Sequence, residues 1–218
     1  WSLGVEEQFY IFFPILMILF LNKGWSFKTF SFLFILLSFF FSCYLSIYNN
    51  QLSFFSLPTR VWELFFGSLM AYLIFFNKID FIKKNILNLL SYIGIICIFL
   101  SFLLFEKNTY HPSYLTLFPV IGTCFIIINF KSDNIIHKIL SSKVFVFVGL
   151  ISYSLYLYHY PIFSFSRYYS LISGYNLYGK IAIMLVIFLI SYLSYSFIEK
   201  PFRNKKKVSF NKLLWFLS

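Results

Sequence analysis

Two adjacent carboxylates stand at the start of an apolar, membrane-length segment. Glu6 and Glu7 lie in WSLGVEEQFY, which runs directly into IFFPILMILF. An ionised carboxylate near hydrocarbon is costly unless it is paired, hydrated or protonated, so acids in such places are candidates for function. We therefore expect Glu6 and Glu7 to belong to a site that handles charge or protons.

A second charged group lies near the start of another apolar segment, LPTRVWELFFGSLMAYLIFF. Pro58 favours the first turn of a helix, and Arg60 and Glu63 follow at i and i+3, on one face and within pairing distance. A purely structural pair with a snorkelling Arg is one interpretation. An Arg in the first turn, however, faces the positive end of the helix dipole, which favours a functional role. Gly67 and Ala71 would let another helix approach closely.

A third candidate is His159 in GLISYSLYLYHYPIF, a polar and aromatic stripe in an apolar span. Ser152, Tyr156 and His159 stand at i, i+4 and i+7 and share one helix face. Pro161 donates no backbone N–H and tends to kink the helix beside His159. Counting about 1.5 Å per residue from Val144 places His159 about 22 Å into the membrane, in its outer half. It is either a proton carrier or a hydrogen-bonded structural histidine.

These charged groups are expected to reach a similar depth. We predict that they line one cavity that opens to the extracytoplasmic side. A position near the other four charged residues favours a functional role for His159. The predicted catalytic set is Glu6, Glu7, Arg60, Glu63 and His159.

The elements that must position these groups are transmembrane helices. The 218 residues are 60% hydrophobic and 11% charged, with a mean hydropathy of +0.81, which excludes a soluble domain. Continuous apolar runs that do not alternate predict an all-α, polytopic helix bundle and not a barrel. The run at 27–48 is apolar all round and is expected to face lipid or fill space. Spans are predicted at 7–21, 27–48, 58–76, 86–105, 113–130, 144–166 and 177–197, with a truncated eighth from 213.

The basic residues are distributed by loop. The formal net charge is +11, but Lys and Arg occupy alternate loops and not one soluble face, which argues against a nucleic-acid partner. Most of the 18 basic residues fall in loops on one side of the predicted membrane. The exceptions, on the opposite side, are Arg60, Lys107, Arg167 and Lys180. This asymmetry predicts an extracytoplasmic Trp1 end and a cytoplasmic Arg203 end.

The cysteines give no sign of a metal site or a disulfide. Cys43, Cys97 and Cys124 each sit inside an apolar span without CxxC or Cys/His spacing, so we interpret them as packing residues. No metal and no bound cofactor is predicted.

Four stretches together resemble the integral-membrane acyltransferase-3 family, which includes O-antigen and peptidoglycan O-acetylases. WSLGVEEQFY is similar to the family's WSLxVEEQFY, and PTRVWELFFGSLMA resembles TRxWELLxGxLLA. ISYSLYLYHYP is similar to SYxxYLxHxP, and FIEKPFR matches the closing IExPxR. The four occur in the family's order, and the resemblance covers about residues 1–203.

The resemblance implies a bacterial inner-membrane enzyme. Members transfer an acyl group, usually acetyl, from cytoplasmic acyl-CoA to a hydroxyl of a carbohydrate or lipid-linked glycan of the cell envelope. Residues 1–203 correspond to the C-terminal part of the domain, and 204–218 are expected to form a basic linker and the start of a further helix. The family's first helices, with their Arg-and-His motif, have no counterpart here, so we expect a fragment of a longer enzyme.

Acyl transfer assigns roles to the candidate residues. It needs a base for the acceptor hydroxyl, an acid that orients the base, and positive charge for the developing oxyanion. Glu6 and Glu7 would orient a base or bind sugar hydroxyls, while Arg60, held by Glu63, would serve the oxyanion or the acceptor. The predicted substrate-binding residues are Trp1, Tyr10, Ser152, Tyr153 and Tyr156.

Two other functions are compatible with the hydropathy of this chain. A glycan or lipid transporter or flippase would use the charged groups as a substrate path, but it predicts inverted repeats, and none is found. An inactive remnant would insert into the membrane and catalyse nothing. The four motifs favour the enzyme, with the lipid bilayer and an envelope glycan as its partners.

Overall fold

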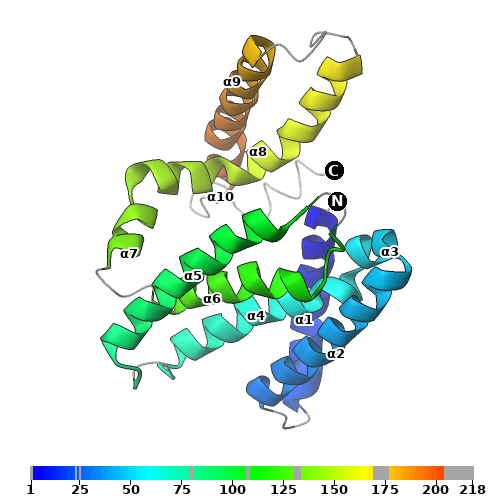
Figure 1. Cartoon of the computed structure of the whole chain (residues 1–218), viewed down its shortest axis with the longest axis vertical. Coiled ribbons are helices and arrows are strands. Elements are labelled where there is room, and N and C mark those ends of the chain that lie inside the picture. The colour runs from blue at the N-terminus through cyan, green and yellow to red at the C-terminus, as the bar shows by residue number, and fades with distance from the viewer. Residues whose placement is uncertain are drawn as a thin grey trace. The chain divides into compact units, whose positions relative to one another are not determined.

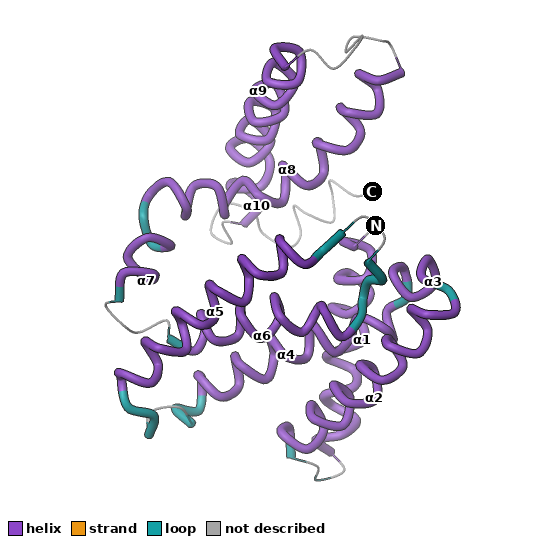
Figure 2. Tube along the Cα trace, viewed as in Figure 1, coloured by secondary structure: helices purple, strands orange, loops and turns teal. Residues whose placement is uncertain are grey.

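The computed structural model describes residues 2–22, 24, 26–78, 81–106, 109–129, 134–168 and 177–203. Over these residues the secondary structure is entirely helical (Figure 2), which confirms the predicted all-α class. The chain divides into two compact units, Trp1–His137 and Lys138–Ser218. The predicted eighth helix from 213 lies outside the described residues.

The helices follow one another through short connections (Figure 1). The first unit contains α1 (Ser2–Asn22), α2 (Phe27–Tyr48), α3 (Asn50–Phe55), α4 (Leu57–Phe75), α5 (Lys84–Leu104), a 3-10 turn (Tyr114–Thr116) and α6 (Leu117–Ile128). The short α7 (Ile135–Leu140) lies at the division between the units. The second unit contains α8 (Lys143–Tyr168), α9 (Leu177–Ser194), a π-helical turn (Tyr195–Glu199) and α10 (Lys200–Arg203).

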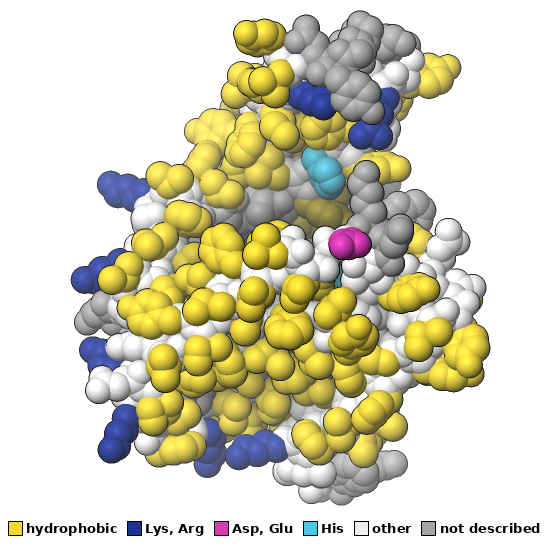
Figure 3. Space-filling model, viewed as in Figure 1, with side chains coloured by type: hydrophobic (Ala, Val, Ile, Leu, Met, Phe, Trp, Pro, Cys, Tyr) yellow, Lys and Arg dark blue, Asp and Glu magenta, His cyan; other side chains and the backbone are white. Residues whose placement is uncertain are grey.

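Five helices of the described chain are long and apolar enough to cross a membrane: Leu3–Phe20, Phe27–Tyr48, Lys84–Leu104, Lys143–Tyr168 and Leu177–Arg203. The predicted span at 58–76 corresponds to α4, which carries the Arg60–Glu63 pair and is not among these five helices. The predicted span at 113–130 is a shorter helical stretch, Tyr114–Ile128. Large hydrophobic side chains cover most of the face seen in Figure 3, as expected of surfaces that contact lipid. The chain is a multi-pass membrane protein.

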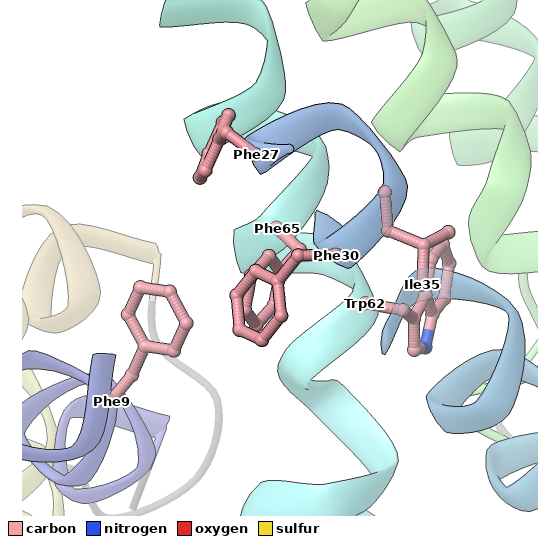
Figure 4. Packing of buried hydrophobic residues seen from close by; sticks show 6 residues of the cluster. All are labelled: Phe9, Phe27, Phe30, Ile35, Trp62 and Phe65. Carbon is pink, nitrogen blue, oxygen red and sulfur yellow. The ribbon is translucent and has the colours of Figure 1, made fainter. Parts of the chain in front are cut away.

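Aromatic side chains from α1, α2 and α4 form the core of the first unit (Figure 4). Phe65 makes edge-to-face contacts with Phe9 and Phe30, at centroid distances of 5.6 and 5.5 Å. Trp62 is fully buried beside them. Such ring pairs add stabilisation beyond the area they bury. The core therefore fixes α4 against its two neighbours.

The buried residues of α2 are Phe27, Phe30 and Ile35, which belong to the aromatic core, and four serines. Ser31, Ser38, Ser42 and Ser46 are buried, whereas Phe32, Leu37 and Phe40 are exposed. Small residues let membrane helices approach closely, and large apolar residues can face lipid. The expectation that this helix faces lipid or fills space therefore describes one of its sides, while the serines form a packing surface.

The close approach of α5 and α6 depends on two glycines. A Cβ atom on Gly94 would lie 2.5 Å from the carbonyl oxygen of Gly122, and one on Gly122 would lie 2.6 Å from that of Gly94. Gly67, which the sequence suggested as a contact point, has nothing within 4 Å in the described chain. The small-residue contact between helices thus occurs at a different pair of positions.

We expect Gly94→Ala to destabilise the protein, because the new methyl group would clash with the backbone carbonyl of Gly122, which cannot move without shifting α6. Overpacking of this kind costs about 1–3 kcal/mol. Gly67→Ala is the matched control and should raise stability by up to about 1 kcal/mol, since Ala favours a helix and space is open there. Thermal unfolding in detergent, followed by size-exclusion fluorescence, checks both signs; equal midpoints for the two variants would contradict this account.

Candidate active site

The charged pair at the start of α4 is formed as its spacing predicts. An Arg60 guanidinium nitrogen donates to a Glu63 carboxylate oxygen at 3.3 Å, and each side chain is only 16% exposed. Pro58 lies in the first turn of the helix. The predicted pairing is confirmed, while its role in chemistry stays a prediction.

Both members of the pair retain unused hydrogen-bonding capacity. Arg60 Nε and Glu63 Oε1 are buried and have no hydrogen-bond partner among the described residues. Buried polar atoms without partners are rare in folded proteins because desolvation is costly. The pair can therefore bind one more polar group from outside the described chain. Arg60 Nε–H would donate a hydrogen bond to that group, and Glu63 Oε1 would accept one from it.

A serine from α2 fixes the turn of α4 that carries Arg60. The Ser38 hydroxyl donates to the Pro58 carbonyl at 2.6 Å and accepts the Trp62 amide at 3.1 Å. These are the two backbone groups that an undisturbed helix joins to each other. The two bonds of Ser38 tie α2 to the first turn of α4, the turn that carries Arg60.

The structure adds a histidine that sequence reasoning missed. His111 lies between α5 and α6; its amide donates to Asn50 Oδ1 at 3.2 Å, and its Nδ1 is 3.0 Å from the Thr116 hydroxyl. The Phe54 ring connects it to the pair: Arg60 lies 5.4 Å above that ring, and the His111 ring is 6.0 Å from it, centroid to centroid. Burial, and then the Arg60 guanidinium, lower the pKa of His111. A neutral imidazole therefore belongs to this cluster.

The only sequence signal for His111 was a histidine before a proline in a short polar stretch between two apolar runs. Such a stretch has no helical period that would point it toward α4. Its contacts reach back 61 residues to Asn50. Sequence spacing therefore offered no way to join it to Arg60.

The two N-terminal carboxylates lie on α1, beside the residues that anchor that helix. Val5 and Phe9 are buried, whereas Glu6 is partly exposed and Glu7 is exposed. Neither carboxylate has a hydrogen bond or ion pair within the described residues. Tyr10 is 67% exposed on the outside of the helix. Their catalytic and substrate-binding roles stay predictions, and Trp1 lies outside the described residues.

The remaining predicted residues lie on α8 in the second unit. Tyr156 and His159 are neighbours, with ring centroids 5.6 Å apart. The Ser152 hydroxyl donates to the Gly149 carbonyl of its own helix at 2.8 Å, and Tyr153 is exposed. Each unit is described by itself, so the single cavity predicted for all five charged residues stays a prediction. What the structure brings together is Arg60, Glu63, Phe54 and His111.

A separate apolar cavity of about 680 Å³ lies among α1, α2, α3 and α4 of the same unit. Its few polar wall groups come from Gln8, Ser38 and Ser56, and Pro58 and Val61 belong to its wall. A cavity with such a lining suits an aliphatic chain and not a charged group. Among the described residues, no cluster of three His, Cys, Asp or Glu side chains could hold a metal ion.

Replacing one member of the Arg60–Glu63 pair should destabilise the folded protein more than replacing both members. Arg60→Met or Glu63→Met leaves a buried charge unpaired, which costs up to about 3–5 kcal/mol, whereas the double variant leaves none. We expect the double variant to unfold at a higher temperature in detergent than either single variant. Additive losses in this cycle would show that the two charges are not coupled.

The lowered pKa of His111 gives stability a defined dependence on pH. His111 binds a proton less readily in the folded protein than in the unfolded chain, where the pKa of a histidine is about 6.5. The contribution is therefore fully present above about pH 6.5 and is lost as the pH falls below it. The unfolding midpoint should drop between about pH 7.5 and pH 5.5, and drop less in His111→Gln. An unchanged slope in His111→Gln would refute the assignment.

Comparison with known proteins agrees with the four sequence motifs. A family model described as an acyltransferase domain matches residues 1–197. O-acetyltransferase OatA of Staphylococcus aureus (strain NCTC 8325 / PS 47) is 31% identical over 222 aligned residues, covering 94% of this chain and 36% of that protein. The putative O-acetyltransferase SACOL0978 of Staphylococcus aureus (strain COL) is 30% identical with the same coverage.

The chain thus spans only about a third of the length of these curated relatives, at 36%. No solved structure matches it. The family model, in contrast, covers most of the chain and includes all the candidate residues described above. The chain belongs to the acyltransferase-3 family of membrane acyltransferases.

Proposed function

We propose that this chain forms part of a bacterial inner-membrane enzyme that transfers an acyl group, with acetyl as the first candidate, to a hydroxyl of an envelope glycan. The donor is acyl-CoA. The observation that carries the proposal is the Arg60–Glu63 pair, whose second N–H donor and second carboxylate oxygen have no partner among the described residues; the pair lies in a segment that resembles a family motif. The relatives named O-acetyltransferases support acetyl transfer to oxygen.

The chemistry follows from these free groups. The acceptor oxygen attacks the acyl carbonyl carbon, the carbon–sulfur bond of the donor breaks, and the hydroxyl proton reaches the departing thiolate through a base. Negative charge develops on the carbonyl oxygen, where a preorganised donor such as Arg60 Nε–H stabilises the transition state. Glu63 holds Arg60 in position and offers its second oxygen to a hydroxyl.

His111 is the candidate base of this cluster. Burial and the neighbouring Arg60 keep its pKa low, so the imidazole is neutral and can accept a proton. Its ring is oriented by the Thr116 hydroxyl, in the way that a third group orients a catalytic histidine. Glu6 and Glu7 keep their predicted role of binding acceptor hydroxyls or orienting a base.

Both substrates have suitable surroundings in the described chain. The apolar cavity among α1, α2 and α4 supports an acceptor attached to a lipid, because it takes an aliphatic chain in its wall of phenylalanine and leucine side chains. On the proposed cytoplasmic side, Lys200 and Arg203 supply positive charge for the phosphates of acyl-CoA, and the thioester end of the donor extends into the membrane toward the acceptor hydroxyl. The loop charges support a cytoplasmic position for Arg203 and an extracytoplasmic one for Trp1.

The test is acetyl transfer to envelope polysaccharide in cells that make the full-length protein. Arg60→Ala should lower transfer by about 10²–10³-fold, the usual effect of removing one oxyanion donor. Glu6→Gln and Glu7→Gln should each reduce it as well. Ester-bound acetate, released from purified glycan by mild base and normalised to the amount of protein in the membrane, gives the readout.

Arg167→Ala is the matched control, because Arg167 is exposed at the end of α8. It should leave transfer unchanged. Normal transfer by Arg60→Ala at normal abundance would overturn the proposed role of the pair. No transfer by the wild-type protein to any envelope glycan would favour the transporter or the inactive remnant.

A further inference from the structure

The side chain of His159 is fixed in one tautomer by its own helix. Its Nδ1 lies 2.7 Å from the Tyr156 carbonyl oxygen and 3.2 Å from that of Leu155. A carbonyl oxygen only accepts hydrogen bonds, so Nδ1 must carry the proton. In the neutral imidazole the other nitrogen, Nε2, then holds a free lone pair.

The residues around this imidazole form an apolar cavity of about 340 Å³ between α8 and α9. Apart from His159 and Tyr156 the wall is aliphatic, aromatic or thioether. The lining residues are Leu155, Tyr156, His159, Phe163, Met184, Ile187 and Phe188. His159 is exposed at the edge of this space, and its Nε2 has no hydrogen-bond partner among the described residues.

This combination selects one class of occupant. The lone pair on Nε2 requires a hydrogen-bond donor, which excludes esters, ketones and hydrocarbons as specific ligands. The apolar wall disfavours a charged group, because desolvating an ion there has no compensation. A neutral hydroxyl attached to an aliphatic body satisfies both conditions.

We propose that this cavity binds the hydroxyl end of an aliphatic, lipid-soluble alcohol, and that His159 Nε2 accepts the hydrogen bond from that hydroxyl. The site belongs to the second unit. It requires no acyl transfer. If the proposed function holds, the same nitrogen is placed to activate a lipid hydroxyl.

Nitrogen-15 NMR of the histidine-labelled chain in lipid nanodiscs tests both steps directly. The chain has 3 histidines, so single His→Gln variants at 111, 137 and 159 assign each imidazole. At about pH 8, His159 should show a protonated Nδ1 and a bare Nε2. A His159 that carries its proton on Nε2 would overturn the inference.

The ligand is then tested with 1-decanol against decane of the same chain length. Decanol should move the Nε2 resonance in the direction of an accepted hydrogen bond, while decane should not. An equal response to both compounds, or none to either, would refute a hydroxyl site.

Two variants separate a specific site from general partitioning into lipid. Ile187→Trp fills the cavity from α9 and should weaken the decanol response at least tenfold while the tautomer is retained. Val146→Trp introduces the same side chain at an exposed position of α8 outside the cavity lining and should respond as the wild type does. A full response in Ile187→Trp would refute the cavity as the binding place. Because these readouts need no turnover, they succeed or fail independently of acetyl transfer by Arg60→Ala.

Discussion

The hydrogen bonds of Ser38 to the first turn of α4 are the interaction on which the candidate active site depends. In hydrocarbon, polar groups must find their hydrogen-bond partners within the protein. Here one hydroxyl serves both the Pro58 carbonyl and the Trp62 amide, which lie on either side of Arg60 in the sequence. The same bonds hold α2 against α4, and the aromatic core around Phe65 joins the same two helices.

With that turn fixed, a buried charged pair becomes possible. Removing Arg60 and Glu63 from water is unfavourable, and a pair of this kind is weak evidence for stability. Its geometry uses one bond of the several that the two side chains can make. Phe54 and His111 then bring an aromatic face and a neutral imidazole to the same place. The arrangement leaves hydrogen-bonding capacity free where catalysis of acyl transfer would require it.

The second unit uses the same principle with different groups. Pro201 lacks an N–H, and the turn before it widens into a π-helix, with the Lys200 amide bonded to the Tyr195 carbonyl. The Glu199 carboxylate, at the end of that turn, accepts the buried Ser154 hydroxyl of α8. These contacts tie α9 to α8. His159 lies further along α8, where its Nδ1 donates to carbonyl oxygens of the same helix and its Nε2 has no partner among the described residues.

The local pattern of the sequence determined much of this protein. Continuous apolar runs predicted the helical membrane bundle, and the i, i+3 spacing after Pro58 predicted the Arg60–Glu63 pair, because helical geometry depends only on neighbouring residues. Four short motifs were enough to predict the family. The same reasoning placed Tyr156 and His159 on one face, which the structure confirms.

Only the tertiary structure decided which distant residues meet. Ser38 reaches Trp62 across 24 residues, and His111 reaches Asn50 across 61. Gly94 and Gly122 meet between helices, whereas Gly67 meets nothing in the described chain. An apolar helix can turn any side toward its neighbours without changing its own pattern, since lipid and protein interior are equally apolar. Packing of small residues and satisfaction of a few polar groups select the side, and neither can be read from spacing along the chain.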